Sequence, residues 1–201
     1  DSAPGSVVYY CLSSLSSRFV MITDLSGSMS THEGSAYRAR TSGTRLAITV
    51  AQLEGLLRGM EADVRLNLVT FSDRARTWQR KLVPMDDRGR ARALEEVAGY
   101  RADGSTNLFE ALQTCFAMAE DSLGDSDLED EAPDTLFLLT DGEPSVGAIQ
   151  DVDLLLEWVA ERNRDLQLRV HCIALNTGPM SRDFMQRLAQ LTSGQYVNPF
   201  D

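Results

Sequence analysis

Three short segments of the sequence carry side-chain oxygens at positions where these atoms could meet. Asp24, Ser26 and Ser28 alternate along the chain directly after an apolar run that is typical of a buried strand. Asp141 ends a second such run, and Thr106 lies in a glycine-containing loop just before a predicted helix. Loops that leave the carboxyl ends of parallel strands gather at one edge of a sheet, so we expect these five side chains to converge.

The chemistry open to this set is the binding of a hard cation. It holds only oxygen donors, with neither His nor Cys, so it suits Mg²⁺, with Mn²⁺ or Ca²⁺ as alternatives, and does not suit zinc. Two carboxylates neutralise a dication and hydroxyls add no charge, so a bound ion would remain a good Lewis acid with one position open. The natural occupant of that position is a carboxylate from another molecule.

Each segment also has an ordinary structural interpretation. Asp and Ser are common turn and N-cap residues after a strand, and Thr106 could cap the helix that follows it. Asp141 and Gly142 could form a plain turn. The occurrence of all three segments in this order, each at a loop-facing position, favours the metal site.

The elements that must position these side chains alternate between strand and helix patterns. Predicted strands cover residues 7–12, 19–24, 64–71, 75–79, 136–139, 170–175 and 195–197. Predicted helices cover residues 44–59, 86–100, 108–119, 151–164 and 181–191. This alternation indicates an α/β fold, a doubly wound and mostly parallel sheet with helices on both faces. We expect one domain at residues 18–201, preceded by a lead-in at residues 1–17 that contains the short first strand.

Together, the three segments resemble the metal-ion-dependent adhesion site of von Willebrand factor type A (vWA) domains. They read Asp-Leu-Ser-Gly-Ser-Met at 24–29, Gly-Ser-Thr-Asn-Leu at 104–108 and Leu-Leu-Thr-Asp-Gly at 138–142, and the strand end Val-Thr-Phe-Ser at 69–72 is similar too. The resemblance extends over nearly the whole chain, residues 18–198. The Arg-rich composition with a single Lys is more similar to bacterial members than to animal integrin I domains.

The resemblance implies a three-layer, Rossmann-like sandwich. Its central sheet would be six-stranded and mostly parallel, with one short antiparallel edge strand at residues 75–79. The implied ligands are three hydroxyls that meet the ion directly or nearly so and two carboxylates that act directly or through water, namely Ser26, Ser28, Thr106, Asp24 and Asp141. The loop at residues 31–43, beside the site, is an insertion that the family does not constrain.

The function that this interpretation favours is a non-enzymatic adhesion or scaffold module. A partner protein would present an Asp or Glu that completes the coordination of the metal. Loops at residues 30–43, 104–107 and 143–147 would supply shape specificity. We expect the isolated domain to be a monomer.

An enzyme is the alternative. A hydrolase could use the same ion to activate water, with His32 as general base. A phosphotransferase of the haloacid-dehalogenase type is disfavoured, because its pattern needs a second Asp where this chain has Ser26. The other histidine, His171, falls in the middle of a predicted strand and is expected to be a core residue.

Composition narrows the class of partner. The 201 residues carry a net charge of −11, much of it in an acidic stretch at residues 121–134 that we expect to be a solvated loop. This balance disfavours binding to nucleic acid. No apolar run approaches the roughly 20 residues of a membrane-spanning helix, so we expect no membrane insertion.

The remaining features concern processing and redox chemistry. Three cysteines are too few for a disulfide scaffold, and Cys115 and Cys172 sit in apolar runs typical of a core. The sequence shows neither an initiator Met nor a signal-peptide pattern, so we expect an excised domain or a processed product. The compartment stays open between cytoplasmic and extracytoplasmic.

Overall fold

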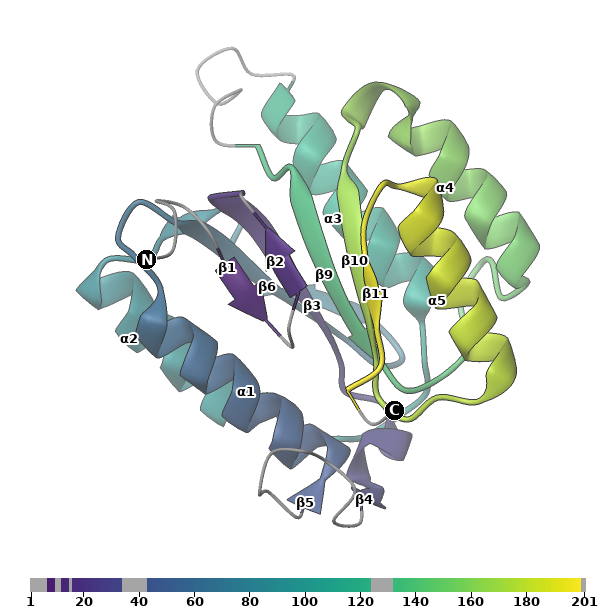
Figure 1. The fold of residues 1–201 in the computed structure, drawn as a ribbon, viewed down its shortest axis with the longest axis horizontal. Helices are drawn as coiled ribbons and strands as arrows, with labels where there is room; N and C mark the ends of the chain where they lie inside the picture. The colour runs from purple at the N-terminus through teal and green to yellow at the C-terminus, as the bar shows by residue number, and fades with distance from the viewer. Residues whose placement is uncertain (1–6, 10–11, 15, 34–42, 124–131, 200–201) are drawn as a thin grey trace.

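A central sheet with helices on both faces makes up the body of the protein (Figure 1). The computed structural model describes residues 7–9, 12–14, 16–33, 43–123 and 132–199. Its main sheet contains β3 (Arg18–Asp24), β6 (Arg65–Phe71), β7 (Ala75–Thr77), β8 (Val83–Pro84), β9 (Thr135–Thr140), β10 (Arg169–Ala174) and β11 (Tyr196–Val197). The helices are α1 (Arg45–Gly59), α2 (Asp87–Ala98), α3 (Leu108–Leu123), α4 (Val152–Leu166) and α5 (Pro179–Leu191). This arrangement confirms the predicted α/β class.

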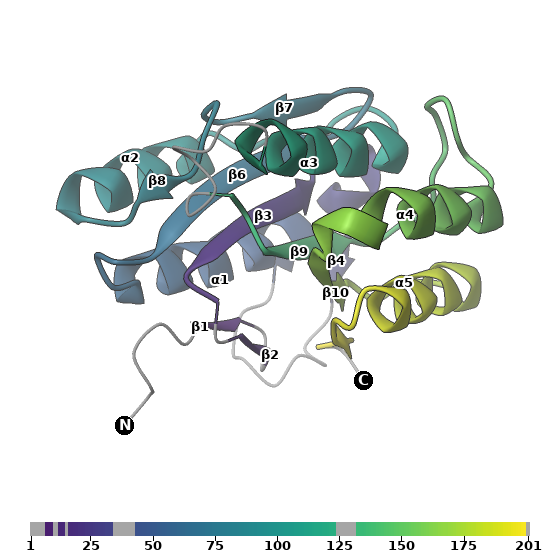
Figure 2. The same ribbon diagram turned by 90° about the horizontal axis from the view of Figure 1, so that it is seen from above.

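The order of strands in the main sheet is β11-β10-β9-β3-β6-β7, with β8 also paired to β6. The five strands from β11 to β6 are parallel, whereas β7 and β8 run antiparallel to β6. Figure 2 shows the helices arranged around this sheet and β7 at its outer margin. The doubly wound, mostly parallel topology is therefore the one that the sequence predicts.

Within the described residues the main sheet has seven strands, not the six that were expected. The additional strand is β8, which pairs Val83 with Leu66 at the start of β6. Its two residues include a proline and show no alternation, so periodicity does not reveal it. The edge strand β7 ends at Thr77 rather than at residue 79. The backbone N–H and C=O of Gln79 form hydrogen bonds with the Asn67 side chain instead of with the backbone of β6.

The segments outside the main sheet also differ from expectation. Residues 7–12 do not form one strand: β1 (Val7–Tyr9) pairs antiparallel with β2 (Leu12–Ser14), where a turn was expected. The ends of the loop at 31–43 pair as β4 (His32–Glu33) and β5 (Gly43–Thr44). Its middle, residues 34–42, lies outside the described residues, as do residues 124–131 of the acidic stretch. The proposed boundary at residue 18 stays a prediction.

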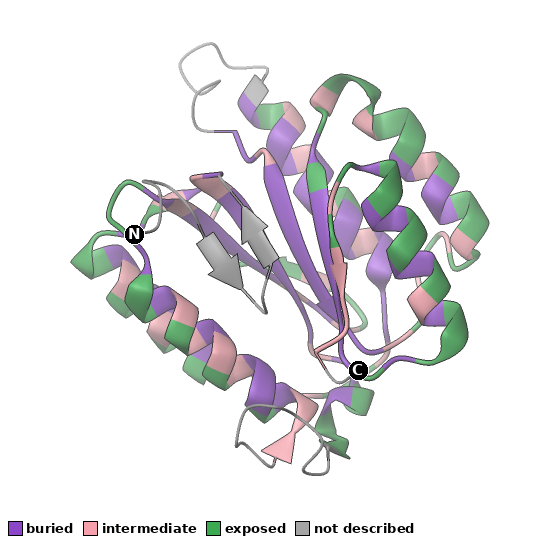
Figure 3. Ribbon diagram, in the orientation of Figure 1, coloured by how far each residue is buried: buried purple, intermediate pink, exposed green. Residues whose placement is uncertain are grey.

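Two hydrophobic cores hold the layers together. Side chains of α3, α4 and α5, including Phe116, Leu155 and Phe184, pack on one face of the sheet. Side chains of α1 and α2, including Leu53 and Val97, pack on the other face. Figure 3 shows the central strands buried between helices whose outer faces are exposed. The sheet therefore stays fixed without help from its loops, which leaves those loops available for binding.

The predicted core residues are buried. His171 in β10 is 2% exposed, stacks on Phe137, and accepts a hydrogen bond at Nδ1 from the Gln195 N–H at 3.2 Å. Burial lowers the pKa of His171 to about 4, so this side chain is neutral at physiological pH. Cys115 and Cys172 are buried free thiols, and burial raises the pKa of both. None of the described helices combines the length and apolar character needed to cross a membrane.

Candidate metal centre

Two carboxylates lie side by side at one edge of the sheet. Asp24 is the last residue of β3, and Asp141 follows the last residue of β9. These strands are adjacent and parallel, with Thr23 opposite Leu139 in the register. Both strands are continuous apolar runs because both of their faces are covered. The predicted adjacency of the two strand ends is confirmed.

Hydrogen bonds join four of the five predicted site residues into one chain. The Ser26 N–H donates to Asp24 Oδ1 at 2.8 Å. The hydroxyls of Ser26 and Ser28 lie 3.1 Å apart, and Ser28 Oγ donates to Asp141 Oδ1 at 2.7 Å. The alternating Asp-x-Ser-x-Ser pattern thus turns its oxygens toward the carboxylate of the neighbouring strand.

The local backbone explains why the oxygens converge. After β3 the chain forms a short 3-10 turn over Gly27–Ser30, anchored by the fully buried Met29. The Gly27 N–H donates to the Gly104 carbonyl at 2.9 Å, which ties this turn to the loop that carries Thr106. Gly104 has φ +80°, and a Cβ there would lie 2.9 Å from Asp73 Oδ2. The positive φ favours glycine at this position, and a larger residue would also displace the Asp73 side chain.

The fifth residue, Thr106, faces the turn that follows β9. This residue is 6% exposed, and its backbone carbonyl accepts a hydrogen bond from the Ser145 N–H at 3.0 Å. A Cβ placed on Gly142 would lie 3.7 Å from Thr106 Oγ1, so the hydroxyl sits beside the Asp141–Gly142 turn. No residue of the described part of the chain hydrogen-bonds with this hydroxyl, which leaves it available to a ligand.

The alternative role for Thr106, capping α3, is wrong. Asn107 caps this helix: its Oδ1 accepts from the Glu110 N–H at 3.2 Å. The Nδ2 of Asn107 also donates to the Asp73 carbonyl at 2.9 Å and to Glu110 Oε2 at 2.8 Å. Asn107 therefore serves both the helix and the loop, and Thr106 is not needed for either.

Burial dominates the electrostatics of Asp24. Removal from water raises the pKa of Asp24, while hydrogen bonds from Ser26 and Thr140 lower it. Burial is the larger effect, and the resulting pKa is about 6. The carboxylate of Asp141 raises the pKa of Asp24 further. Thr140 Oγ1 donates to Asp24 Oδ2 at 2.5 Å. The buried charge of Asp24 is therefore incompletely compensated, a state that a cation relieves.

Arg45 is a site residue that the sequence reasoning missed. It is the first residue of α1, and its Nη1 donates to Asp141 Oδ2 at 2.6 Å. The Arg45 side chain is 14% exposed and that of Asp141 is fully buried, so the pair is well shielded. The capping role of Thr44 predicts where α1 begins, and Thr44 Oγ1 does accept from the Ala47 N–H. Nothing in the sequence indicated that this helix start meets the end of β9.

The donor set was tested against the chemistry of a divalent ion. Among the described residues, no three His, Cys, Asp or Glu side chains come together, which disfavours a zinc site. Two carboxylates and three hydroxyls instead match a hard cation that keeps some of its water. Arg45 occupies Asp141 Oδ2, while Asp141 Oδ1 faces Ser28 and belongs to the chain of oxygens. The residues present fit Mg²⁺ or a similar ion.

Neither His32, the suggested general base, nor Glu143, the acid two residues beyond Asp141, joins the hydrogen bonds of the site in the described part of the chain. His32 lies in β4 with an exposed side chain, and no hydrogen bond among the described residues links it to the five oxygens. Glu143 is also exposed, and it accepts a hydrogen bond from the hydroxyl of Ser181, a residue of α5, at 3.3 Å. Neither side chain is oriented toward the site by a hydrogen bond of the described residues, as a general base commonly is.

Comparisons with known proteins agree with this architecture. The family model described as von Willebrand factor type A domain matches residues 18–198. Von Willebrand factor A domain-containing protein 3A of Homo sapiens is 31% identical over 134 residues, which cover 66% of this chain and 10% of that protein. Inter-alpha-trypsin inhibitor heavy chain H4 of Homo sapiens is 29% identical over 136 residues, 68% of this chain and 13% of that protein. The chain thus matches only a small part of these relatives.

A solved structure is similar in fold. The von Willebrand factor type A structure from Catenulispora acidiphila superposes with a TM-score of 0.68 and 18% sequence identity, covering 90% of this chain and 38% of that one. The family model extends over nearly all of the chain, from the first residue of β3 to just past β11. The chain therefore belongs to the von Willebrand factor type A domain family, whose members typically mediate protein–protein interaction.

Proposed function

We propose that this domain is a non-enzymatic module that binds a protein partner through a divalent cation. Mg²⁺ is the preferred ion, with Mn²⁺ or Ca²⁺ as alternatives. An Asp or Glu of the partner completes its coordination. When bound, the ion supplies a Lewis acid that holds this carboxylate. The side chains that hold the ion are Asp24, Ser26, Ser28, Thr106 and Asp141.

The observation that carries this proposal is the chain of oxygens at the ends of β3 and β9. Ser28 bridges the two loops, with 3.1 Å to Ser26 and 2.7 Å to Asp141. Each of these short contacts between oxygens is one that a shared cation can replace. The free hydroxyl of Thr106 adds a donor from a third loop. This arrangement supports one ion reached by all three loops.

The neighbouring loops can read the shape of a partner. Glu143 and Ser145 are exposed beside Thr106, and Gly27, Ser28 and Ser30 are exposed on the other side of the site. Their backbones are tied down by the hydrogen bonds from Gly27 to Gly104 and from Ser145 to Thr106. A preformed rim of this kind lowers the entropy lost on binding.

The hydrolase alternative has less support. It needs a base within hydrogen-bond reach of a water at the ion, and the exposed His32 makes no hydrogen bond to the site within the described part of the chain. The bacterial-type character inferred from the Arg-rich composition stays a prediction, as does the monomeric state.

The replacement Asp24→Asn should stabilise the metal-free domain above pH 6. The pKa of Asp24 rises from 3.8 to about 6 on folding, so the native state binds more protons between these values. The unfolding free energy of the wild type therefore falls as pH rises through this window. The amide avoids this loss, and we expect a gain of about 1–3 kcal/mol at pH 7.5 in EDTA. Urea unfolding at pH 4 and pH 7.5 measures it.

Asp165→Asn is the matched control, because Asp165 is an exposed acid on α4. It should shift the unfolding free energy by less than about 0.5 kcal/mol at either pH. In excess Mg²⁺ the wild type should gain stability by mass action and Asp24→Asn should not. An Asp24→Asn variant that is less stable than the wild type in EDTA at pH 7.5 would contradict this account of the site.

Thr106→Ala should weaken Mg²⁺ binding without destabilising the fold. The hydroxyl makes no hydrogen bond within the described residues, so its loss costs the folded state little. We expect the dissociation constant for Mg²⁺ to rise about tenfold, as for a lost metal contact. Titration calorimetry measures this constant and thermal unfolding measures stability.

Asn107→Ala provides the reciprocal control at the next residue. It removes the α3 cap and should cost about 1 kcal/mol of stability, while it leaves the Mg²⁺ donors in place. Equal loss of Mg²⁺ affinity in both variants would show that Mg²⁺ binding depends on the conformation of the loop and not on the Thr106 hydroxyl.

The partner chemistry can be tested with displayed random peptides. Panning in Mg²⁺ should enrich peptides with an Asp or Glu at a fixed position, whose binding is lost in EDTA and with Asp24→Ala. Changing that acid to Asn or Gln should abolish binding, because an amide does not replace a carboxylate at the cation. Enriched peptides that bind equally well in EDTA and tolerate the amide would overturn the proposed mechanism.

A further inference from the structure

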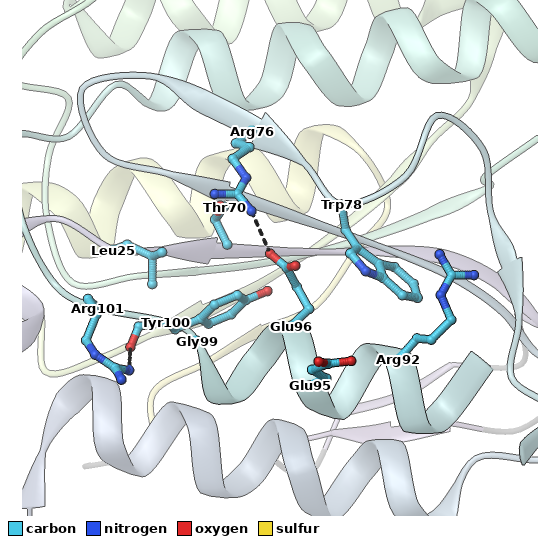
Figure 4. A pocket seen from close by; sticks show the side chains of 10 residues that line it. All are labelled: Leu25, Thr70, Arg76, Trp78, Arg92, Glu95, Glu96, Gly99, Tyr100 and Arg101. Atoms are coloured by element: carbon cyan, nitrogen blue, oxygen red, sulfur yellow. Dashed lines mark hydrogen bonds and ion pairs between the residues drawn. The ribbon is translucent and has the colours of Figure 1, made fainter. Parts of the chain in front are cut away.

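A cavity of about 530 Å³ lies between α2 and the strand β7, and its lining reaches Leu25 but includes none of the five metal-site residues. Figure 4 shows the side chains that line it, among them three arginines, two glutamates, a tryptophan and a tyrosine. Arg76 pairs with Glu96 at 3.2 Å but is 75% exposed, and the Arg92 guanidinium lies 5.5 Å from the Trp78 ring centre. The guanidinium groups here are accessible to an anion.

The tyrosine is the polar group that points to a ligand. Tyr100 is 6% exposed, and its buried hydroxyl has no hydrogen-bond partner among the described residues. In Figure 4 this hydroxyl lies among the side chains that line the cavity and points toward that of Glu96. A buried hydroxyl left without a partner is costly, and an acceptor brought by a ligand would satisfy it.

The cavity borders an open edge of the sheet. In the described part of the chain, β7 pairs only with β6, and Figure 2 shows it at the outer margin. The backbone N–H of Trp78 donates to the Leu68 carbonyl, so Trp78 faces a hydrogen-bonded partner on β6. Because such pairs alternate along an antiparallel ladder, Arg76, two residues earlier, also exchanges hydrogen bonds with β6. The N–H and C=O groups of Ala75 and Thr77 therefore point away from β6, where another strand can pair with them.

A second cavity, of about 810 Å³, lies on the opposite face of the same edge. Its lining includes Thr77 and the basic side chains of Arg80, Lys81 and Arg162, with Asp121 as its acid. The side chains of β7 alternate between the two faces, so Arg76 borders the first cavity and Thr77 the second. An added strand would place its own alternate side chains over both cavities.

This edge is basic in an acidic protein. Residues 74–101 contain eight Arg or Lys and four Asp or Glu, a net charge of +4, whereas the whole chain carries −11. The free edge, the two flanking cavities and the local positive charge all favour the same occupant.

We propose that β7 binds an extended acidic segment of a partner protein as an added strand. Its backbone pairs with Ala75 and Thr77, and its carboxylates meet Arg76 and Arg92 in one cavity and Lys81 in the other. Main-chain bonds provide affinity in such strand addition, and the pockets for alternate side chains provide specificity. This site is independent of the metal centre, so it extends the proposed function to a second contact.

Other occupants fit less well. A nucleic acid backbone would set phosphate oxygens against the outward carbonyls of Ala75 and Thr77, and the net charge of −11 would repel the rest of the polymer. A second copy pairing edge to edge would bring the Arg76 side chains of both copies together, a like-charge contact that disfavours it.

Binding can be measured by fluorescence anisotropy with a labelled twelve-residue peptide that repeats Glu-Glu-Val-Val, which places Glu side chains on both faces of an added strand. The same peptide with Lys in place of Glu is the sequence control and should not bind. Thr77→Pro removes the outward N–H but no bond to β6, and we expect it to weaken binding at least about tenfold. Thr77→Ala keeps this N–H and should bind within about twofold of the wild type.

The charge contribution is tested on one helix. Arg92→Ala removes a cavity guanidinium and should weaken binding about fivefold or more, whereas Arg88→Ala, an exposed arginine of α2 outside the cavity lining, should have little effect. Thermal unfolding verifies that each variant is folded. If Thr77→Pro does not fold, hydrogen exchange of the wild type replaces it as the test of strand pairing. Peptide binding should then slow the exchange of the Ala75 and Thr77 amides.

The two proposals fail separately. Binding of this peptide should be unchanged in EDTA and by Asp24→Ala. The edge site would be overturned by any of three results. These are no binding of the peptide, equal binding by Arg92→Ala and the wild type, or no protection of the Ala75 and Thr77 amides from hydrogen exchange. Loss of binding in EDTA would assign the peptide to the metal centre instead. A dimer in sedimentation that Thr77→Pro dissociates would replace the acidic partner with a second copy.

Discussion

The parallel pairing of β3 with β9 is the constraint on which the candidate site depends. Both strands run through the centre of the sheet with fully covered faces, so their register is held by apolar packing rather than by the loops. Asp24 and the Asp141 turn therefore emerge beside each other whether or not anything binds them. This placement destabilises the ionised form of Asp24, whose pKa rises to about 6 because the side chain is buried. A fold selected for stability alone would have little reason to keep a carboxylate there.

Hydrogen bonds from outside the two strands complete the arrangement. The Gly27–Gly104 backbone bond links the Asp-x-Ser-x-Ser turn to the Thr106 loop, and Asn107 caps α3 and leaves the Thr106 hydroxyl free. Arg45 adds a positive charge at the outer oxygen of Asp141. The site is thus assembled from three loops and one helix start, and backbone hydrogen bonds such as that from Gly27 to Gly104 hold these segments together.

Much of this could be predicted from the sequence, because the signals were local. Continuous apolar runs predicted β3 and β9, the alternation of elements predicted the parallel sheet, and Thr44 predicted the start of α1. What the sequence did not reveal depended on tertiary contacts. The strand β8 has two residues and no pattern of its own, and β7 is shortened by the Asn67 side chain. Arg45 is an ordinary residue of a first helical turn until the fold sets that turn against Asp141.

The central claim is that one divalent ion is shared by Asp24 and Asp141. The most direct test is a crystal of this domain soaked in Mn²⁺, with anomalous scattering collected to locate the ion. The account predicts a single strong anomalous peak within coordination distance, about 2.2 Å, of oxygens from both the Asp24–Ser28 turn and the Thr106 or Asp141 loops. A peak bound only to surface carboxylates elsewhere, with Asp24, Ser26, Ser28 and Asp141 keeping their mutual hydrogen bonds, would contradict it.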